Sequence, residues 1–98
     1  MRTLLFVLLA TAPAAAHEAP SGWAYGSECC STMDCFEEQD KNVETASNGF
    51  HIKNTGEVIP YADKRVKMSK DAKYHRCTRL GDPKMPRSIC IYVPNRGS

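Results

Sequence analysis

The chain has 98 residues, with 13 Lys and Arg against 11 Asp and Glu and a formal net charge of +2. A chain of this length forms one small domain, and such domains bury only about 60% of their unfolded surface. Five cysteines in so short a chain favour disulfide staples over a large apolar core. No recognised nucleic-acid-binding motif accompanies the basic residues, so nucleic acid is excluded as a partner.

The first 16 residues have the pattern of a secretory signal peptide, with one positive charge before an apolar run at 4–10. Small residues follow at Ala12, Ala14 and Ala16. Cleavage after Ala16 leaves His17 first, with cleavage after Ala12 or Ala14 as the alternatives. The apolar run is far shorter than the roughly 20 residues of a membrane helix. We therefore expect an exported protein, periplasmic or secreted, with no membrane span after cleavage.

The first part of the mature chain contains turn-forming residues rather than a periodic pattern. Residues 17–26 include Pro20, Gly22 and Gly26, which predicts an irregular arm. Ser27 is a favourable cap for a short helical turn through Cys29 and the following residues.

The clearest secondary-structure signal lies between Asn42 and Pro60. Turn residues at Asn48-Gly49 and at 54–56 separate three β-forming runs, which predicts a three-stranded meander over 43–46, 50–53 and 57–59. Alternation along the middle strand places Phe50 and Ile52 on one face and His51 on the other.

The remainder of the chain predicts a loop and two more strands. The polar, basic segment 61–73 has no period and is expected to be a surface loop that holds at most one helical turn. Strands are expected at 74–77 and 89–93, on either side of a loop containing Gly81, Pro83 and Pro86. The predicted fold is a single small β-rich domain over 17–98, α+β at most and stapled by disulfides.

Five cysteines leave one unpaired if two disulfides form within the chain: Cys29, Cys30, Cys35, Cys77 and Cys90. Adjacent cysteines are poor partners for each other because a vicinal bridge closes a strained ring. We favour long-range bridges from the 29–35 turn to the strands of Cys77 and Cys90. A local Cys30–Cys35 bridge and an odd thiol that links two chains are the alternatives.

The residues suggest no catalytic centre. The cysteines form the pattern C-C-x-x-x-x-C rather than the C-x-x-C of a thiol redox enzyme. His75 and Cys77 share one face of a strand, but a nucleophile and a base also need an orienting third group. We therefore expect a protein without enzymatic activity.

One metal hypothesis depends on the mature N-terminus. If cleavage follows Ala16, the α-amine and imidazole of His17 can chelate one ion together, and copper suits such nitrogen ligands. His51 or His75 would supply the third nitrogen. This arrangement predicts a copper-binding periplasmic protein as an alternative function.

Charge is distributed unevenly along the mature chain. Residues before Pro60 carry about −6 (eight acids, two bases), and those from Pro60 onward carry about +7 (three acids, ten bases). This predicts that the acidic half lies against the basic half. It also predicts a patch that contacts an anionic partner, such as a cell-envelope component: Lys64, Arg65, Lys67 and Lys70.

Several short motifs extend over most of the mature chain: Glu28-Cys29-Cys30-Ser31, Asp34-Cys35, Gly56 to Tyr61, Tyr74 to Cys77 and Cys90 to Pro94. Together they resemble a family of small exported bacterial proteins that has no assigned function. The resemblance implies a bacterial, periplasmic or secreted setting and transfers no catalytic residue.

The sequence therefore predicts an exported, disulfide-stabilised binding or structural module that is not catalytic. Its partner is either an anionic envelope component or a secreted protein. Copper binding through His17 and inhibition of a secreted enzyme are the alternative functions.

Overall fold

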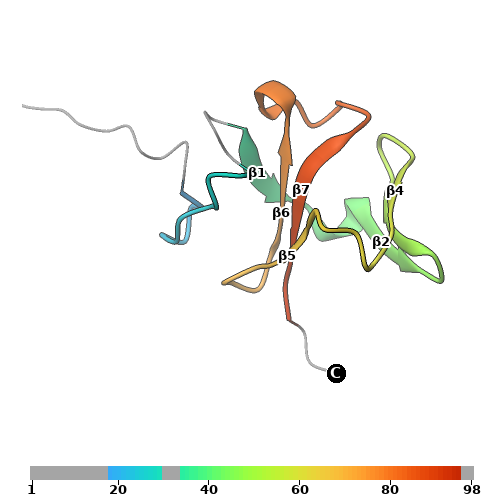
Figure 1. Ribbon diagram of the computed structural model, residues 1–98, viewed down its shortest axis with the longest axis horizontal. Helices are drawn as coiled ribbons and strands as arrows, with labels where there is room; N and C mark the ends of the chain where they lie inside the picture. Colours follow the sequence, from blue (N-terminus) through green and yellow to red (C-terminus); the bar gives the residue numbers. More distant parts are fainter. Residues whose placement is uncertain (1–17, 30–33, 96–98) are drawn as a thin grey trace, which may run out of the picture.

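Seven strands in two sheets form the part of the chain that the computed structural model describes, residues 18–29 and 34–95 (Figure 1). No α-helix occurs within these residues. The larger sheet has the order β1 (Cys35–Glu38), β6 (Tyr74–Thr78), β7 (Ser88–Val93), β5 (Val66–Met68). The smaller sheet has the order β2 (Val43–Ala46), β3 (Gly49–Ile52), β4 (Glu57–Ile59). Two 3-10 turns, η2 (Asp40–Asn42) and η3 (Arg79–Gly81), complete the elements. The predicted β-rich fold is confirmed.

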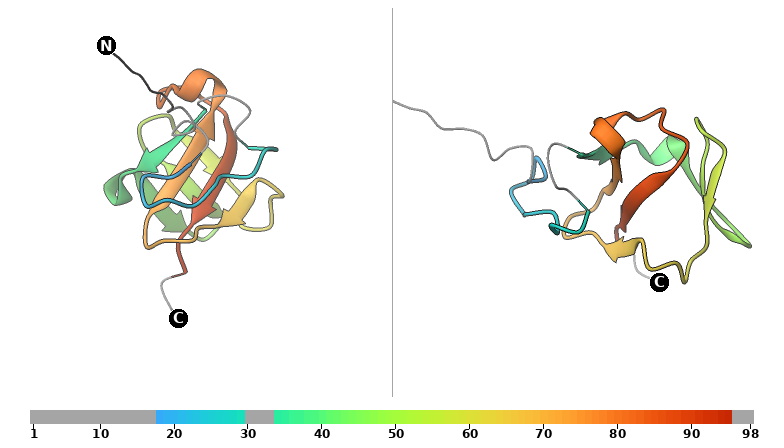
Figure 2. Two further views of the ribbon diagram at one scale, coloured as in Figure 1. Left: turned by 90° about the vertical axis from the view of Figure 1, so that its left-hand side faces the viewer. Right: turned by 45° about the horizontal axis from the view of Figure 1, so that its top comes forward.

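The larger sheet is the middle of three layers, with the N-terminal arm on one side and the smaller sheet on the other (Figure 2). Each side has its own apolar cluster. The arm side buries Ala19, Tyr25, Cys29, Cys77, Cys90 and Tyr92. The side facing the smaller sheet buries Val43, Phe50, Ile52, Ile59, Tyr74 and Ile91. The larger sheet is therefore buried on both faces, which explains why every side chain of β6 is buried.

The three-stranded meander is confirmed. β2 pairs with β3 and β3 with β4, all antiparallel, and Phe50 and Ile52 are buried on one face as the alternation predicts. The first turn differs in detail, because its central residues are Ser47 and Asn48 and Gly49 is the first residue of β3. Gly49 has a φ of 142°, and a Cβ there would lie 2.3 Å from the Ile59 carbonyl oxygen. Glycine is thus required by close approach as well as by backbone conformation.

The two expected C-terminal strands are confirmed as β6 and β7, whereas the prediction of a loop throughout 61–73 is wrong at its centre. β5 forms there and pairs in parallel with β7, Val66 lying opposite Ile91. The Ile91 amide donates to the Arg65 carbonyl oxygen at 3.0 Å. This three-residue strand lacks a period of its own and forms because β7 provides its hydrogen-bonding partner. β1 was not expected at all.

The favoured disulfide pattern is confirmed, with bridges Cys29–Cys90 and Cys35–Cys77. The first ties Cys29, three residues after the arm, to β7, and the second ties edge strand β1 to β6. Cys30 lies outside the described residues, as do His17 and the expected signal peptide. Two disulfides are consistent with an oxidising environment outside the cytoplasm. Within the described residues, no helix has the length and apolar character to cross a membrane.

The arm is a closed turn from residue 18 onward. Glu18 and Ala24 form an isolated antiparallel β-bridge, and the Ala19 amide donates to the Trp23 carbonyl oxygen at 2.8 Å. After it, the Cys29 amide donates to the Gly26 carbonyl oxygen at 2.9 Å, so a single turn occupies the start of the expected helical turn. Residues 30–33 of that prediction lie outside the described residues.

Gly49→Ala tests the close approach of β3 to the end of β4. We expect it to lower the free energy of unfolding by about 3 kcal/mol or more, because backbone atoms must move to admit the methyl group. Gly56→Ala is the matched control. Gly56 also has a positive φ, of 80°, but its Cβ would meet no atom within 4 Å, so about 1 kcal/mol is expected. Urea unfolding of both variants measures the difference, and equal losses would contradict the close-approach argument.

Candidate functional site

Two adjoining hollows lie along β7 and share Arg65 and Ile89. The first, of about 390 Å³, is lined by Arg65, Arg79, Met85, Pro86, Arg87, Ser88 and Ile89. The second, of about 270 Å³, is lined by Glu28, Lys64, Arg65, Lys67, Ile89 and Cys90. Together they form the basic groove, in which cationic side chains flank apolar ones.

A β-bulge places Ile89 in this groove. Cys77 lies opposite Cys90, but the next residue, Thr78, lies opposite Ser88, so β7 contains one extra residue between them. A bulge of this kind re-aims a side chain that regular alternation would have turned elsewhere. Ile89 is consequently 37% exposed in a strand whose neighbours Ser88 and Cys90 are buried.

Arg65 has a structural role beneath the groove. Its Nη1 lies 2.9 Å from Glu57 Oε2 and donates to the Ser88 carbonyl oxygen at 3.0 Å, and its Nη2 lies 2.9 Å from Asp63 Oδ2. Hydrogen bonds from Arg65 lower the pKa of Asp63 to about 2. Arg65 therefore joins β4, the 61–65 loop and β7, and its charge is balanced within the protein.

The other cations of the groove face solvent. The side chains of Lys64, Arg79 and Arg87 are exposed, and none forms a hydrogen bond or an ion pair with another residue that the structure describes. Lys67 Nζ lies 3.5 Å from Glu28 Oε2, in a partly exposed pair. Exposed pairs of this kind are weak. The groove therefore presents three cations that form no ion pair within the described part of the chain, of which Arg87 lies close enough to Asp63 to help lower the pKa of that carboxyl.

The structure brings together most of the predicted anionic-partner patch and adds to it. Lys64, Arg65 and Lys67 line the groove, whereas exposed Lys70 does not. Sequence reasoning missed Arg79, Arg87 and Ile89. The two arginines are distant in sequence from the basic run at 64–70, and the bulge that exposes Ile89 has no sequence signature.

A second cluster lies at the arm and centres on His75, which has no exposed surface. Its Nδ1 lies 2.9 Å from the Tyr25 hydroxyl, and its Nε2 lies 2.8 Å from Asp71 Oδ1. Trp23 stacks edge-on against the imidazole with ring centroids 4.9 Å apart. Both ring nitrogens are thus engaged, and a substrate has no access to the ring. The four-residue spacing of Asp71 and His75 was the available sequence signal.

Asp71 fastens the arm to the domain. Trp23 Nε1 donates to Asp71 Oδ2 at 2.9 Å, and the Ser21 hydroxyl donates to the same oxygen at 2.5 Å. Burial raises the pKa of Asp71, but hydrogen bonds from Ser21, His75 and Trp23 outweigh it and hold the pKa well below its usual range. The charged form of Asp71 is therefore part of the folded structure.

The two candidates for the third copper ligand lie in different sheets. His75 lies in the larger sheet and His51 in the smaller one, where its Nε2 is 2.6 Å from Asn48 Oδ1. His17 lies outside the described residues, which contain no group of three or more His, Cys, Asp or Glu side chains arranged to hold a metal ion. Cys77 is held in a disulfide, so the pair with His75 is not a nucleophile and its base.

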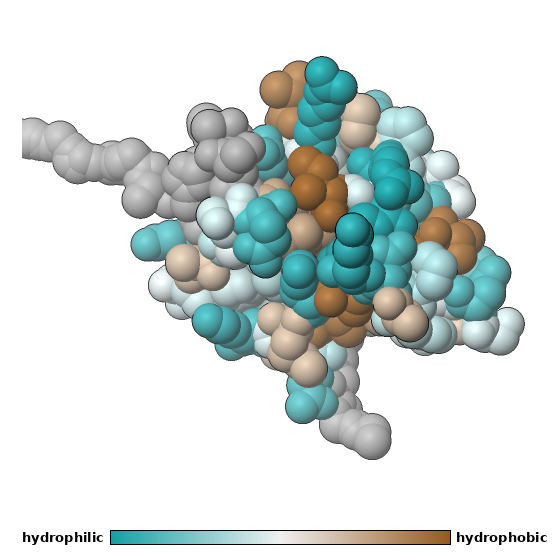
Figure 3. Space-filling view, in the orientation of Figure 1, coloured by the Kyte–Doolittle hydropathy of each residue, from teal (hydrophilic) through white to brown (hydrophobic). Residues whose placement is uncertain are grey.

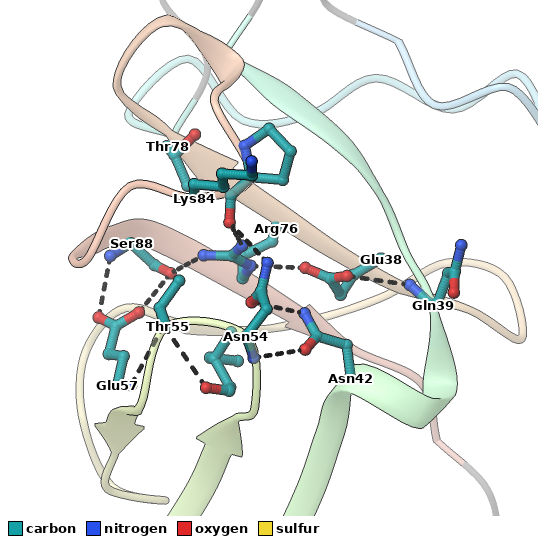
Figure 4. A network of polar contacts seen from close by, with 12 residues as sticks. Glu38, Gln39, Asn42, Asn54, Thr55, Glu57, Arg76, Thr78, Lys84 and Ser88 are labelled. Carbon is teal, nitrogen blue, oxygen red and sulfur yellow. Dashed lines mark hydrogen bonds and ion pairs between the residues drawn. The ribbon is translucent and has the colours of Figure 1, made fainter.

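A buried polar network lies on the opposite face of the larger sheet (Figure 4). Arg76, which has no exposed surface, donates to Glu38 at 2.7 Å and to the Ser88 hydroxyl at 3.0 Å. Ser88 in turn donates to Glu57 at 2.7 Å. The network links both sheets. An open hollow of about 610 Å³ beside it is lined by Phe36, Glu37, Glu38, Gln39, Lys41, Asn42, Lys53, Asn54 and Pro83.

Comparisons with protein-family models, with curated proteins and with solved structures found no match. The resemblance to a family of small exported bacterial proteins stays a prediction.

Asp71→Asn tests the anchoring of the arm. Because the pKa of Asp71 is lowered on folding, its ionised form stabilises the protein above about pH 4, and this contribution is lost as the pH falls further. We expect the variant to lose about 2 kcal/mol of unfolding free energy at pH 7 and less additional stability than wild type between pH 4 and pH 2. Thermal unfolding across this pH range measures both effects.

Trp23→Phe is the matched control, because it removes one donor to Asp71 and keeps the carboxylate. It should cost about 1 kcal/mol and retain the acid sensitivity of wild type. An Asp71→Asn variant with wild-type acid sensitivity would contradict the assignment.

Proposed function

We propose that the protein is an exported, non-catalytic binding module that holds an anionic partner, such as a polymer of the cell envelope, in the basic groove. The observation that carries the proposal is the set of cations around Ile89. Lys64, Arg79 and Arg87 have no ion-pair partner among the described residues, although the chain contains 11 acidic residues. Charge of one sign in a groove attracts ligands of the opposite sign.

The groove is supported by rigid elements. Cys90 lines it and is bonded to Cys29, which follows the arm, and Arg65 beneath it is fixed by Glu57 and Asp63. Little conformational freedom is lost when a ligand binds to such a surface, which favours affinity. The two hollows follow one another along β7, and this elongated shape suits a chain-like anionic partner better than a single small anion.

Two observations support a binding role over catalysis. His75 is enclosed by Tyr25, Trp23 and Asp71, and Cys77 is oxidised, so neither offers a reactive group to a substrate. The groove instead offers cations and apolar surface, which bind but do not react. Export is supported by the signal-like first 16 residues, by the disulfides and by the family resemblance. No described contact favours inhibition of a secreted enzyme.

Charge reversal at Lys64 and Arg87 tests the groove. We expect the double variant Lys64→Glu, Arg87→Glu to bind dextran sulfate, used as a soluble anionic polymer, at least tenfold more weakly than wild type. Arg65 is left unchanged because its substitution would disturb the fold. Isothermal titration calorimetry at several NaCl concentrations measures the affinity, which should fall as salt screens the contacts.

The double variant Lys41→Glu, Lys53→Glu is the matched control, because it makes the same change in net charge at exposed lysines beside a different hollow. Its affinity should stay within about threefold of wild type, and neutral dextran should not bind. Equal losses in both double variants, or no binding of dextran sulfate at low salt, would overturn the proposal.

A further inference from the structure

Leu80 is the most exposed large apolar side chain of the described residues, with 82% of its surface accessible. It lies in η3, at the start of the loop that joins β6 to β7. This loop forms the top of the molecule in the view of Figure 1. The other exposed apolar side chains that project strongly, Met68 and Tyr61, lie on different segments. Leu80 is thus an isolated apolar tip.

The backbone of Leu80 is strained as well. Its φ of 63° and ψ of 12° lie in the left-handed region, and it is the one non-glycine residue with a positive φ in the described part of the chain. The Cβ of an L-residue is crowded in this conformation, which glycine and asparagine tolerate far better. Exposure and backbone strain both disfavour leucine at this position. The fold itself therefore gives no reason for leucine here, which makes Leu80 a candidate for a functional role.

The surrounding turn holds Leu80 outward. The Thr78 hydroxyl donates to the Asp82 carbonyl oxygen at 2.8 Å, and the Asp82 amide donates to the Arg79 carbonyl oxygen at 3.3 Å. Gly81 follows Leu80 with a φ of 67°. These contacts close the turn, and the Leu80 side chain remains exposed to solvent.

Cations flank the tip. Arg79 precedes Leu80, and Lys84 and Arg87 follow in the same loop, all three exposed. The carboxylate of Asp82 accepts the Lys84 amide at 2.9 Å, so the one acid of this loop is turned onto its own backbone. Apolar and hydrophilic side chains stand next to each other at the top of the space-filling view (Figure 3). The loop therefore combines one exposed apolar side chain with three exposed cations.

We propose that this tip docks on a lipid bilayer that contains anionic lipids, with Leu80 inserted at the boundary between headgroups and acyl chains. Arg79 and Lys84 then contact lipid phosphates, as juxtamembrane cations do. A bilayer accepts a convex apolar tip anywhere on its surface, whereas a partner protein would need an acidic pocket shaped for one leucine. The proposal goes beyond the basic groove, because neither Leu80 nor Lys84 lines it.

Leu80→Asn tests the proposal, since asparagine suits the left-handed backbone and removes the apolar tip. We expect the melting temperature to equal or exceed that of wild type, while co-sedimentation with vesicles of equal parts phosphatidylglycerol and phosphatidylcholine weakens about tenfold or more. Leu80→Met keeps an apolar tip and should bind within about threefold of wild type. Vesicles of phosphatidylcholine alone should bind wild type weakly.

Met68→Asn is the matched control, because Met68 is 64% exposed but lies on β5, below the middle of the molecule in Figure 1 and away from the β6–β7 loop at its top. It should leave vesicle binding unchanged. If Leu80→Asn fails to fold, Leu80→Gly replaces it with the same expected result.

Two outcomes would overturn the proposal: no sedimentation of wild type at millimolar anionic lipid, or equal binding by wild type and Leu80→Asn. The first would leave the tip as a docking point for a protein. Failure here is separable from failure of the basic groove, because Leu80→Asn should keep the wild-type affinity for dextran sulfate.

Discussion

The buried guanidinium of Arg76 is the constraint on which the rest of the structure depends. Within β6 it reaches Glu38 on one neighbouring strand, Ser88 on the other, and the Pro83 carbonyl oxygen in the loop above, at 2.6 to 3.0 Å. Ser88 continues the contacts to Glu57 in the smaller sheet. A charge this deep is tolerable only while its partners remain, and loss of one typically costs about 3 to 5 kcal/mol. The two sheets are therefore held in one arrangement by the requirement to satisfy a single buried cation.

On the opposite face of β6, disulfide bonds stabilise a domain that has few large apolar side chains. Cys77 lies next to Cys90 across the β6–β7 pair, and their disulfides extend to β1 and to Cys29, which follows the arm. The bulge begins directly after this cysteine pair and turns Ile89 out of the sheet. Neighbouring residues of β7 thus contribute to both features: Cys90 carries a disulfide, and Ile89 lines the groove. A domain with so few large apolar residues gains its rigidity from polar and covalent contacts, and the same contacts shape its surface.

The sequence patterns predicted those secondary-structure elements that are determined by neighbouring residues in the chain. The meander follows from turn residues and alternation, and Gly49 was recognised although its close approach to β4 was not. Strands β1 and β5 were missed because each is short and forms only beside a partner from a distant part of the chain. In the site, Lys64 and Lys67 were predicted from their run of charge. Arg65 was predicted as part of the same patch, but its guanidinium is paired with Asp63, two residues before it, and with Glu57 of β4. The positions of Arg79, Arg87 and Ile89 depend on a bulge and a loop, which no single-sequence pattern encodes.

The fold pairs acidic residues from the first half of the chain with basic residues from the second half. Glu28, Glu38 and Glu57, from the acidic half, pair with Lys67, Arg76 and Arg65, from the basic half, as the sequence predicts. In these pairs the side chains of Glu38 and Glu57 are buried, whereas that of Glu28 is exposed. Arg79 and Arg87 of the basic half remain exposed in the β6–β7 loop. Pairing between the halves therefore leaves Lys64, Arg79 and Arg87 along the groove without an ion pair among the described residues, in a protein whose net charge is only +2. The anionic partner proposed above would be oriented by these cations before any contact forms, because the local field and not the net charge directs the encounter.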